Sequence, residues 1–179
     1  MMLNLPRAET AGMEETMKAA IIMGSTSDLP KVEPAVKILK DYGVEVLVRC
    51  LSAHRAHAGL SDFIEETNKN GTEVIITAAG MAAALPGVVA SQTVLPVIGV
   101  PLSGSVLDGM DALMSIVQMP SGIPVATVAI NGSKNAAYLA LQIMAIKHES
   151  IKEKLLDERK NMEKAAMEAN EEVISKYQN

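Results

Sequence analysis

Five short runs rich in β-branched residues, separated by segments with helical periodicity, constrain the fold of this chain more than any other feature. Strand-length runs that alternate with helices form βαβ units, and successive units place their strands side by side in a parallel sheet. We therefore predict an α/β fold: a three-layer, doubly wound parallel sheet of the flavodoxin or Rossmann-like type, with a long C-terminal helix. The predicted strands span 19–23, 44–50, 73–77, 96–100 and 124–130. The predicted helices span 31–42, 60–69, 85–92, 108–117 and 135–147.

The stretch from Val74 to Leu107 contains no charged residue and so imitates a membrane span, which needs ~20 apolar residues. Three prolines and four glycines divide it into pieces of strand or short-helix length. Each proline would also remove a helix hydrogen bond in lipid. We interpret the stretch as strands buried on both faces and expect no membrane association.

The 179 residues are enough for one domain with extensions. We expect a flexible N-terminal tail over 1–17, one α/β catalytic domain over 18–147, and a C-terminal helix over 148–179. The tail has three glutamates and no continuous apolar stretch, so it does not resemble a secretory signal. The single cysteine, Cys50, suits a reducing cytoplasm. Because Cys50 ends a predicted buried strand, we expect it to serve packing; a nucleophilic role is the alternative.

Composition argues against nucleic acid as a partner. The formal net charge is −5, Trp is missing, and there are only one Phe and three Tyr. The chain therefore lacks both a broad cationic surface and an aromatic platform on which bases could stack.

The segment 148–179 is dense in charges of both signs and carries a sparse apolar pattern. Its apolar residues form two interleaved series with a spacing of eleven, which places them on one narrow stripe of a helix. They are Ile151, Leu155, Met162, Ala166, Val173 and Tyr177. Such a helix either returns along its own domain or reaches across a neighbouring subunit. We favour the second arrangement, and with it a homo-oligomer, because the helix is long for so small a domain.

Ligands of open parallel sheets bind beyond the carboxyl ends of the strands, and the first strand is followed there by GSTSD, residues 24–28. Gly24 would permit a tight turn, and the hydroxyls of Ser25 and Ser27 with the free amides of the helix start could bind an anion. Asp28 could cap the helix or hold a sugar hydroxyl. An ordinary capping turn explains this segment equally well.

The second strand leads to SAHRAH, residues 52–57. The guanidinium of Arg55 could hold a phosphate from the side opposite GSTSD, and His54 could donate and accept a proton near neutral pH. His57 starts a helix, where we expect it to face solvent.

The third strand leads to AAGMAAALPG, residues 78–87, whose small side chains would let a ligand contact backbone amides. The fourth leads to PLSGS, residues 101–105. No His, Cys or acidic cluster has the spacing of metal ligands, so we predict no metal. These residues indicate a site for a small phosphorylated metabolite with one candidate acid/base.

Taken together, GSTSD, SAHR, ALPGVVAS and SIVQMPSGIPVATVAI resemble, in this order and spacing, the 5-(carboxyamino)imidazole ribonucleotide mutases of bacterial purine biosynthesis. The resemblance covers residues 19–147. It implies a homo-octamer in which the C-terminal helix contacts neighbouring subunits, and a reaction without a cofactor. In that reaction a carboxylate moves from the exocyclic nitrogen to C4 of a phosphoribosyl aminoimidazole.

Carried over by motif, the resemblance also implies roles for individual residues. Phosphoribosyl contacts fall on Ser25, Asp28 and Arg55, with Ser27 and Ser52 alongside, and the general acid/base is His54. The remaining expected substrate contacts are Gly24, Ala53, Gly80 and Leu85.

The chain departs from the mutase pattern between residues 77 and 87. Ala84 replaces a histidine that normally faces the site, and Ala78 and Met81 replace glycines. Three alternatives follow. A carboxylase that uses free carbon dioxide would usually carry SAHK and AGRSN, and a nicotinate-dinucleotide carboxylase would have a cysteine where this chain has Met119. A non-catalytic nucleotide-binding protein would be consistent with Ala84.

Overall fold

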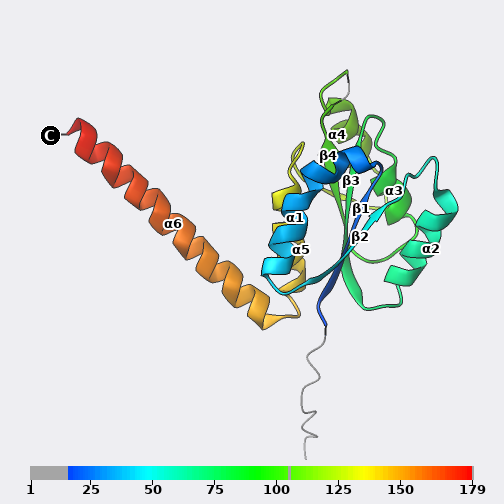
Figure 1. Cartoon of the computed structure of the whole chain (residues 1–179), viewed down its shortest axis with the longest axis horizontal. Coiled ribbons are helices and arrows are strands. Elements are labelled where there is room, and N and C mark those ends of the chain that lie inside the picture. The colour runs from blue at the N-terminus through cyan, green and yellow to red at the C-terminus, as the bar shows by residue number, and fades with distance from the viewer. Residues whose placement is uncertain (1–15, 105, 179) are drawn as a thin grey trace, which may run out of the picture.

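The computed structural model describes residues 16–104 and 106–178. Its core is one parallel sheet in the order β2-β1-β3-β4-β5 (Figure 1). This order, in which the chain starts in the interior and winds in both directions, is that of a doubly wound fold, as predicted. The strands are β1 (Lys18–Met23), β2 (Glu45–Cys50), β3 (Thr72–Gly80), β4 (Val97–Leu102) and β5 (Ala126–Thr127).

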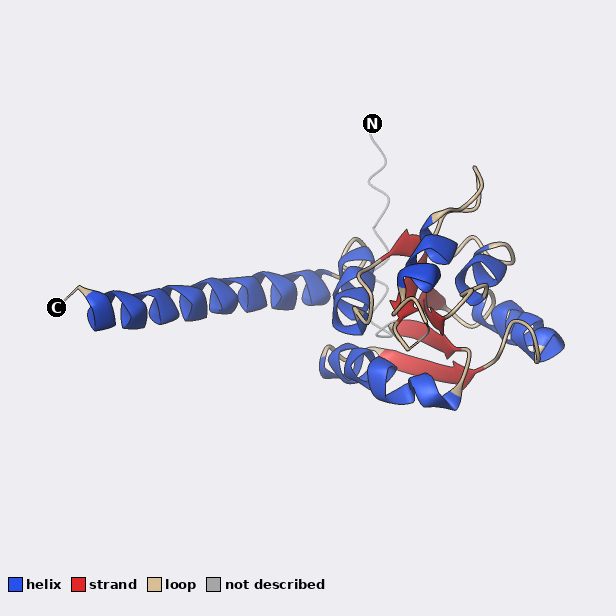
Figure 2. Ribbon diagram, turned by 90° about the horizontal axis from the view of Figure 1, so that it is seen from above, coloured by secondary structure: helices blue, strands red, loops and turns tan. Residues whose placement is uncertain are grey.

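Helices cover both faces of the sheet, which gives the predicted three layers (Figure 2). Alternate residues of β1 explain the two cores: Ala19 and Ile21 pack under α1 and α5, whereas Ala20 and Ile22 pack under α2, α3 and α4. The helices of the domain are α1 (Leu29–Asp41), α2 (His57–Thr67), α3 (Leu85–Ala90), α4 (Met110–Val117) and α5 (Ser133–Met144), preceded by a short 3-10 helix, η1 (Thr26–Asp28).

The predicted elements begin and end within about three residues of the observed ones, except for the last strand. The prediction of a strand over 124–130 is wrong in length, because only Ala126 and Thr127 pair with β4. Beyond them the chain follows β4 through single bonds, such as Val128 N to Gly99 O (3.1 Å). An edge strand that follows a proline has few ladder bonds to make.

The expectation that Cys50 is buried in packing is also wrong, because the cysteine is exposed. It ends β2, which lies at the edge of the sheet and pairs only with β1. The residues at both ends of β2 are exposed, and those between them are partly buried. Alternation along the sequence did not distinguish this edge strand from the buried interior strands.

The long helix α6 (Glu149–Tyr177) projects away from the domain instead of returning along it (Figures 1 and 2). The hydroxyls of Tyr42 and Tyr138 donate to the two carboxylate oxygens of Glu158, and Ile151 alone among the described residues of α6 is buried. Past this anchor the predicted apolar stripe is exposed, with Tyr177 at 74%. In the described part of the chain, no helix is long and apolar enough to cross a membrane.

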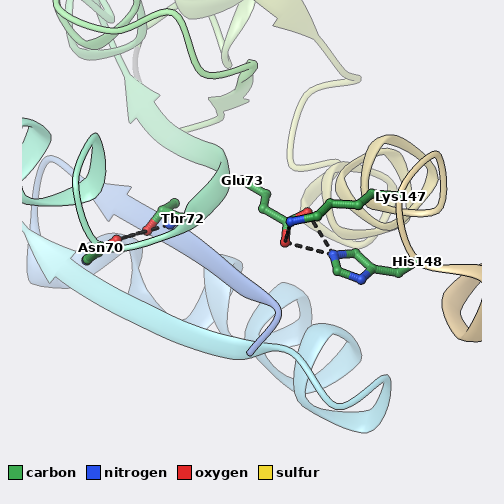
Figure 3. Close-up of polar contacts among 5 residues, drawn as sticks. All are labelled: Asn70, Thr72, Glu73, Lys147 and His148. Carbon is green, nitrogen blue, oxygen red and sulfur yellow. Dashed lines mark hydrogen bonds and ion pairs between the residues drawn. The ribbon is translucent and has the colours of Figure 1, made fainter. Parts of the chain in front are cut away.

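At the amino end of the sheet, the junction between α5 and α6 is tied to the start of β3 (Figure 3). Nε2 of His148 lies 2.7 Å and 3.0 Å from the two carboxylate oxygens of Glu73, and Nζ of Lys147 lies 3.9 Å from the nearer one. Beside them the Asn70 side chain accepts hydrogen bonds from the backbone and hydroxyl of Thr72. These polar side chains find their partners within the chain.

Candidate active site

A cavity of about 610 Å³ opens at the carboxyl ends of β1 to β4. It lies where α1 and α2 leave the sheet on opposite faces, which is where doubly wound sheets bind ligands. Its volume falls within the usual range for small-molecule sites. All ten residues that the sequence assigned to the site line this cavity: Gly24, Ser25, Ser27, Asp28, Ser52, Ala53, His54, Arg55, Gly80 and Leu85.

The GSTSD segment forms a compact, self-bonded loop. The Ser25 hydroxyl accepts a hydrogen bond from the Ser27 backbone (3.3 Å) and lies 2.8 Å from the Ser27 hydroxyl. The Asp28 carboxylate accepts from the Ser25 backbone at 3.2 Å, which completes a capping box around η1. Capping and ligand binding are therefore compatible here, because the same loop both starts the helix and lines the cavity.

Gly24 has a different role from the one predicted. Its φ is not in the left-handed region, so the turn does not require glycine. A Cβ added there would meet no atom within 4 Å. The missing side chain leaves open space in the cavity wall, where a ligand can approach the backbone.

Asp28 is the carboxylate of the cavity. Desolvation by burial raises its pKa, while the hydrogen bond from Ser25 and the nearby charge of Lys31 act in the opposite direction. An ionised carboxylate that has lost part of its water without gaining a full ion pair can accept hydrogen bonds from a ligand such as a sugar.

His54 and Arg55 come from the turn between β2 and α2. Backbone bonds from Arg55 N (3.3 Å) and Ala56 N (2.9 Å) to Ser52 O close this turn and hold both side chains at the cavity rim. Within residues 16–104 and 106–178, no carboxylate lies within 4.0 Å of the guanidinium, so its charge is available to a ligand. His57 starts α2, is exposed and lies outside the cavity lining, as predicted.

The loop after β3 forms the floor of the cavity. A Cβ on Gly80 would lie 3.2 Å from the Leu102 carbonyl oxygen, so the close approach of the loops after β3 and β4 favours glycine. Met81, one of the departures noted above, has a φ of 55° and is 69% exposed. This left-handed conformation costs a side-chain-bearing residue about 1 kcal/mol. Ala84 also lines the cavity, so the departure at that position changes the site itself.

Two polar residues of the cavity were not selected from the sequence: Lys31 and Ser103. Nζ of Lys31 donates to the Ser103 carbonyl at 2.7 Å, although 72 positions separate the two residues. The sequence contained a feature that could have identified each residue. Lys31 lies three residues after Asp28 and so on the same side of the helix start, and Ser103 belongs to the PLSGS segment after the fourth strand.

Comparison with known proteins shows the family of the chain. The AIR carboxylase family matches residues 18–165. The N5-carboxyaminoimidazole ribonucleotide mutase of Pyrococcus abyssi is 52% identical over 147 residues, covering 82% of this chain and 84% of that protein. The phosphoribosylaminoimidazole carboxylase of Saccharomyces cerevisiae is 47% identical over 173 residues, covering 96% of this chain but 29% of that protein. The solved structure of Treponema denticola PurE has a TM-score of 0.77 at 31% identity, covering 90% of this chain and 99% of that chain.

The family match spans the whole sheet, every cavity-lining residue and the first part of α6. It confirms the resemblance drawn from the four motifs, including the segment that contains Ala84 in place of histidine. Both the sequence and the fold therefore show that the chain belongs to the AIR carboxylase family.

Proposed function

We propose that this chain is a mutase that converts 5-(carboxyamino)imidazole ribonucleotide to 4-carboxy-5-aminoimidazole ribonucleotide. One observation carries the proposal: all ten residues inferred from the mutase motifs meet in a single cavity. The same activity is supported by sequence identity: about half of the aligned residues are identical to those of a protein named as such a mutase. The reaction is an isomerisation, so it consumes no second substrate.

The phosphoribosyl group would bind between the loops after β1 and β2. Arg55 supplies a fork of donors for the phosphate, and the hydroxyls of Ser25, Ser27 and Ser52 supply neutral donors. The start of α1 adds its positive dipole end. The Asp28 carboxylate would accept hydrogen bonds from the ribose hydroxyls, since an ionised carboxylate can only accept.

The carboxylate transfer would take place under the loop after β3. The bond between the exocyclic nitrogen and the carboxylate breaks, carbon dioxide is released inside the cavity, and the exocyclic nitrogen gains a proton. C4 then attacks the carbon dioxide and loses its own proton. One proton is gained and one is lost, so a single acid/base in the cavity, His54, suffices for both transfers. Retention of carbon dioxide next to C4 replaces a second-order encounter with an intramolecular step.

We also propose that the chain acts as a homo-oligomer, an octamer according to the mutase resemblance, in which α6 contacts neighbouring subunits. The support is the exposed stripe on a helix that leaves its own domain, with Met162 at 54%, Val173 at 57% and Tyr177 at 74% exposure. Apolar side chains in regular spacing on an isolated helix need a partner surface. The cytoplasm is the proposed location.

Turnover tests the proposal directly. The purified chain would receive either the carboxyamino nucleotide without bicarbonate, or aminoimidazole ribonucleotide with bicarbonate, while the C4-carboxylated product is followed. Product from the first reaction alone is the expected result. Product from the second reaction alone would show that the chain is a carboxylase that uses free carbon dioxide. Product from neither reaction would indicate a binding protein.

A further inference from the structure

The ammonium group of Lys31 is a cation in the cavity that the mutase motifs do not assign. Lys31 is a half-buried residue in the first turn of α1. Its Nζ donates to the Ser103 carbonyl oxygen at 2.7 Å and lies 3.4 Å from the Ser103 hydroxyl. The side chain thus reaches from the loop after β1 to the loop after β4.

Ser103 is itself held in place on its other side. Its backbone N–H donates to the Asn131 side chain at 3.1 Å, and the Asn131 amide donates to the Ser103 hydroxyl at 2.8 Å. The Asn131 backbone in turn donates to the Pro101 carbonyl at 2.8 Å. Lys31 therefore rests against a fixed support. An ammonium has three N–H donors, so at least one remains available for a ligand.

The groups that contact the Lys31 ammonium are uncharged: they are the carbonyl and the hydroxyl of Ser103. In the part of the chain that the structure describes, no carboxylate lies within 4.0 Å of Nζ. Asp28 acts on it only at longer range. A partly desolvated cation without a charged partner is unfavourable by itself, and an anionic ligand removes that cost.

The strand order separates Lys31 from Arg55 within the cavity. Arg55 follows β2, whereas the Lys31 ammonium lies against the loop that follows β4, and β1 and β3 lie between them. Three strand spacings correspond to about 14 Å. The cavity thus presents one cation at each end, with the small side chains of the loop after β3 between them.

We propose that Lys31 is a specificity-determining residue that binds the carboxylate of the aminoimidazole at the end of the cavity opposite the phosphate. The inference rests on the proposed function, which supplies a ligand with two anionic ends. Ala84 contributes no polar side-chain atom to this cavity, and among its described lining residues Lys31 is the cation at the end beside the loop after β4.

Two ligands that differ only in the carboxylate separate this role from others. Calorimetry would give the Kd of the full chain for 4-carboxy-5-aminoimidazole ribonucleotide and for aminoimidazole ribonucleotide. Lys31→Gln removes the charge but keeps a donor for the Ser103 carbonyl, and Lys31→Arg keeps the charge. Lys37→Met is the matched control, because Lys37 is an exposed lysine of α1 paired with Asp41 outside the cavity.

We expect Lys31→Gln to weaken binding of the carboxylated nucleotide by about 10-fold to 100-fold, the effect of a charged hydrogen bond. Binding of the uncarboxylated nucleotide should stay within about twofold of the unmodified chain, and Lys31→Arg should restore most of the loss. Equal weakening for both nucleotides would place Lys31 on the phosphate and overturn the inference. Unchanged affinity for both, with turnover intact, would overturn it while leaving the proposed function standing. If the unmodified chain binds neither nucleotide, the proposed function itself fails.

Discussion

The two ends of the sheet treat their charged residues in opposite ways. At the amino end, Glu73 faces His148 and Lys147, and the Glu73 and His148 side chains are only 18% and 12% exposed. At the carboxyl end, Arg55 and Lys31 have no carboxylate within ion-pair distance among the described residues, and burial raises the pKa of Asp28. Charges paired within the chain hold its parts together. Charges left without such partners are the ones that a ligand can satisfy.

The local conformations at the two ends also differ. At the amino end, side chains such as Asn70 and Thr72 bond to one another and to the chain (Figure 3). At the carboxyl end, Met81 is in a left-handed conformation and Gly24 leaves an unfilled space. The cavity at the carboxyl end therefore retains groups that are unfavourable without a ligand.

The largest effect is expected from His54→Asn. Loss of the acid/base should lower turnover about 10²-fold to 10⁴-fold, whereas the nucleotide affinity should change little because the phosphate and ribose contacts remain. Steady-state kinetics and calorimetry would measure the two. His57→Asn is the matched control, since His57 is exposed outside the cavity, and it should leave turnover unchanged. Turnover within tenfold in the His54 variant would show that another group moves the protons.

Arg55→Ala should lower the affinity for both nucleotides about 10-fold to 100-fold, because it removes the charged donors proposed for the phosphate. Arg55→Lys should recover only part of this loss, since an ammonium cannot form the two parallel bonds of a guanidinium. Titration calorimetry at two salt concentrations would measure the effect. If the affinity does not depend on the residue at position 55, the phosphate does not bind at this end of the cavity.

At the amino end, Glu73→Ala should lower the free energy of unfolding by about 1–3 kcal/mol, because it leaves the half-buried His148 ring without its acceptor. Turnover per folded molecule should be unchanged. Urea unfolding would test this beside Glu65→Ala, which breaks an exposed pair with Lys69 and should cost less than about 1 kcal/mol. A loss of activity without a loss of stability would contradict the division between the two ends.

Met81→Gly should raise the free energy of unfolding by about 1 kcal/mol, since glycine adopts a φ of 55° without the steric cost that a side chain imposes. Urea unfolding at neutral pH would measure the gain. Met81→Ala is the control, because alanine shortens the side chain but keeps the Cβ. A gain for alanine as large as that for glycine would assign the effect to the exposed side chain instead of the backbone.

The smallest effect is expected from Asp28→Asn and depends on pH. Because the folded-state pKa of Asp28 is raised above 3.8, its ionised form destabilises the fold at neutral pH, and this penalty disappears below 3.8. The variant should therefore be slightly more stable than the original chain at pH 7 and equal to it near pH 3.5, while binding nucleotide less tightly. Unfolding curves at both pH values would show this. The matched control, Asp62→Asn, removes an equal charge from an exposed position of α2.

Most of the site could be predicted from the sequence because its residues are local in the chain. Ser25 to Asp28 and Ser52 to Arg55 each directly follow a strand, and parallel strands bring those ends together. Lys31 was missed because its partner is 72 positions away, and its value depends on what lies across the cavity. Gly24 was placed correctly but for the wrong reason, because a φ angle is a property of the folded loop.

The sequence by itself determined the elements, their order and the three-layer class, since the periods of 2 and 3.6 residues and the turn residues act over a few positions. Tertiary structure alone decided that β2 is an edge strand with an exposed Cys50, and that β5 is only two residues long. It also decided that His148 meets Glu73, 75 positions away, and that Tyr42 and Tyr138 anchor α6 at Glu158. These outcomes depend on which segments become neighbours in space. Local patterns specify which face of an element is buried, but not which partner buries it.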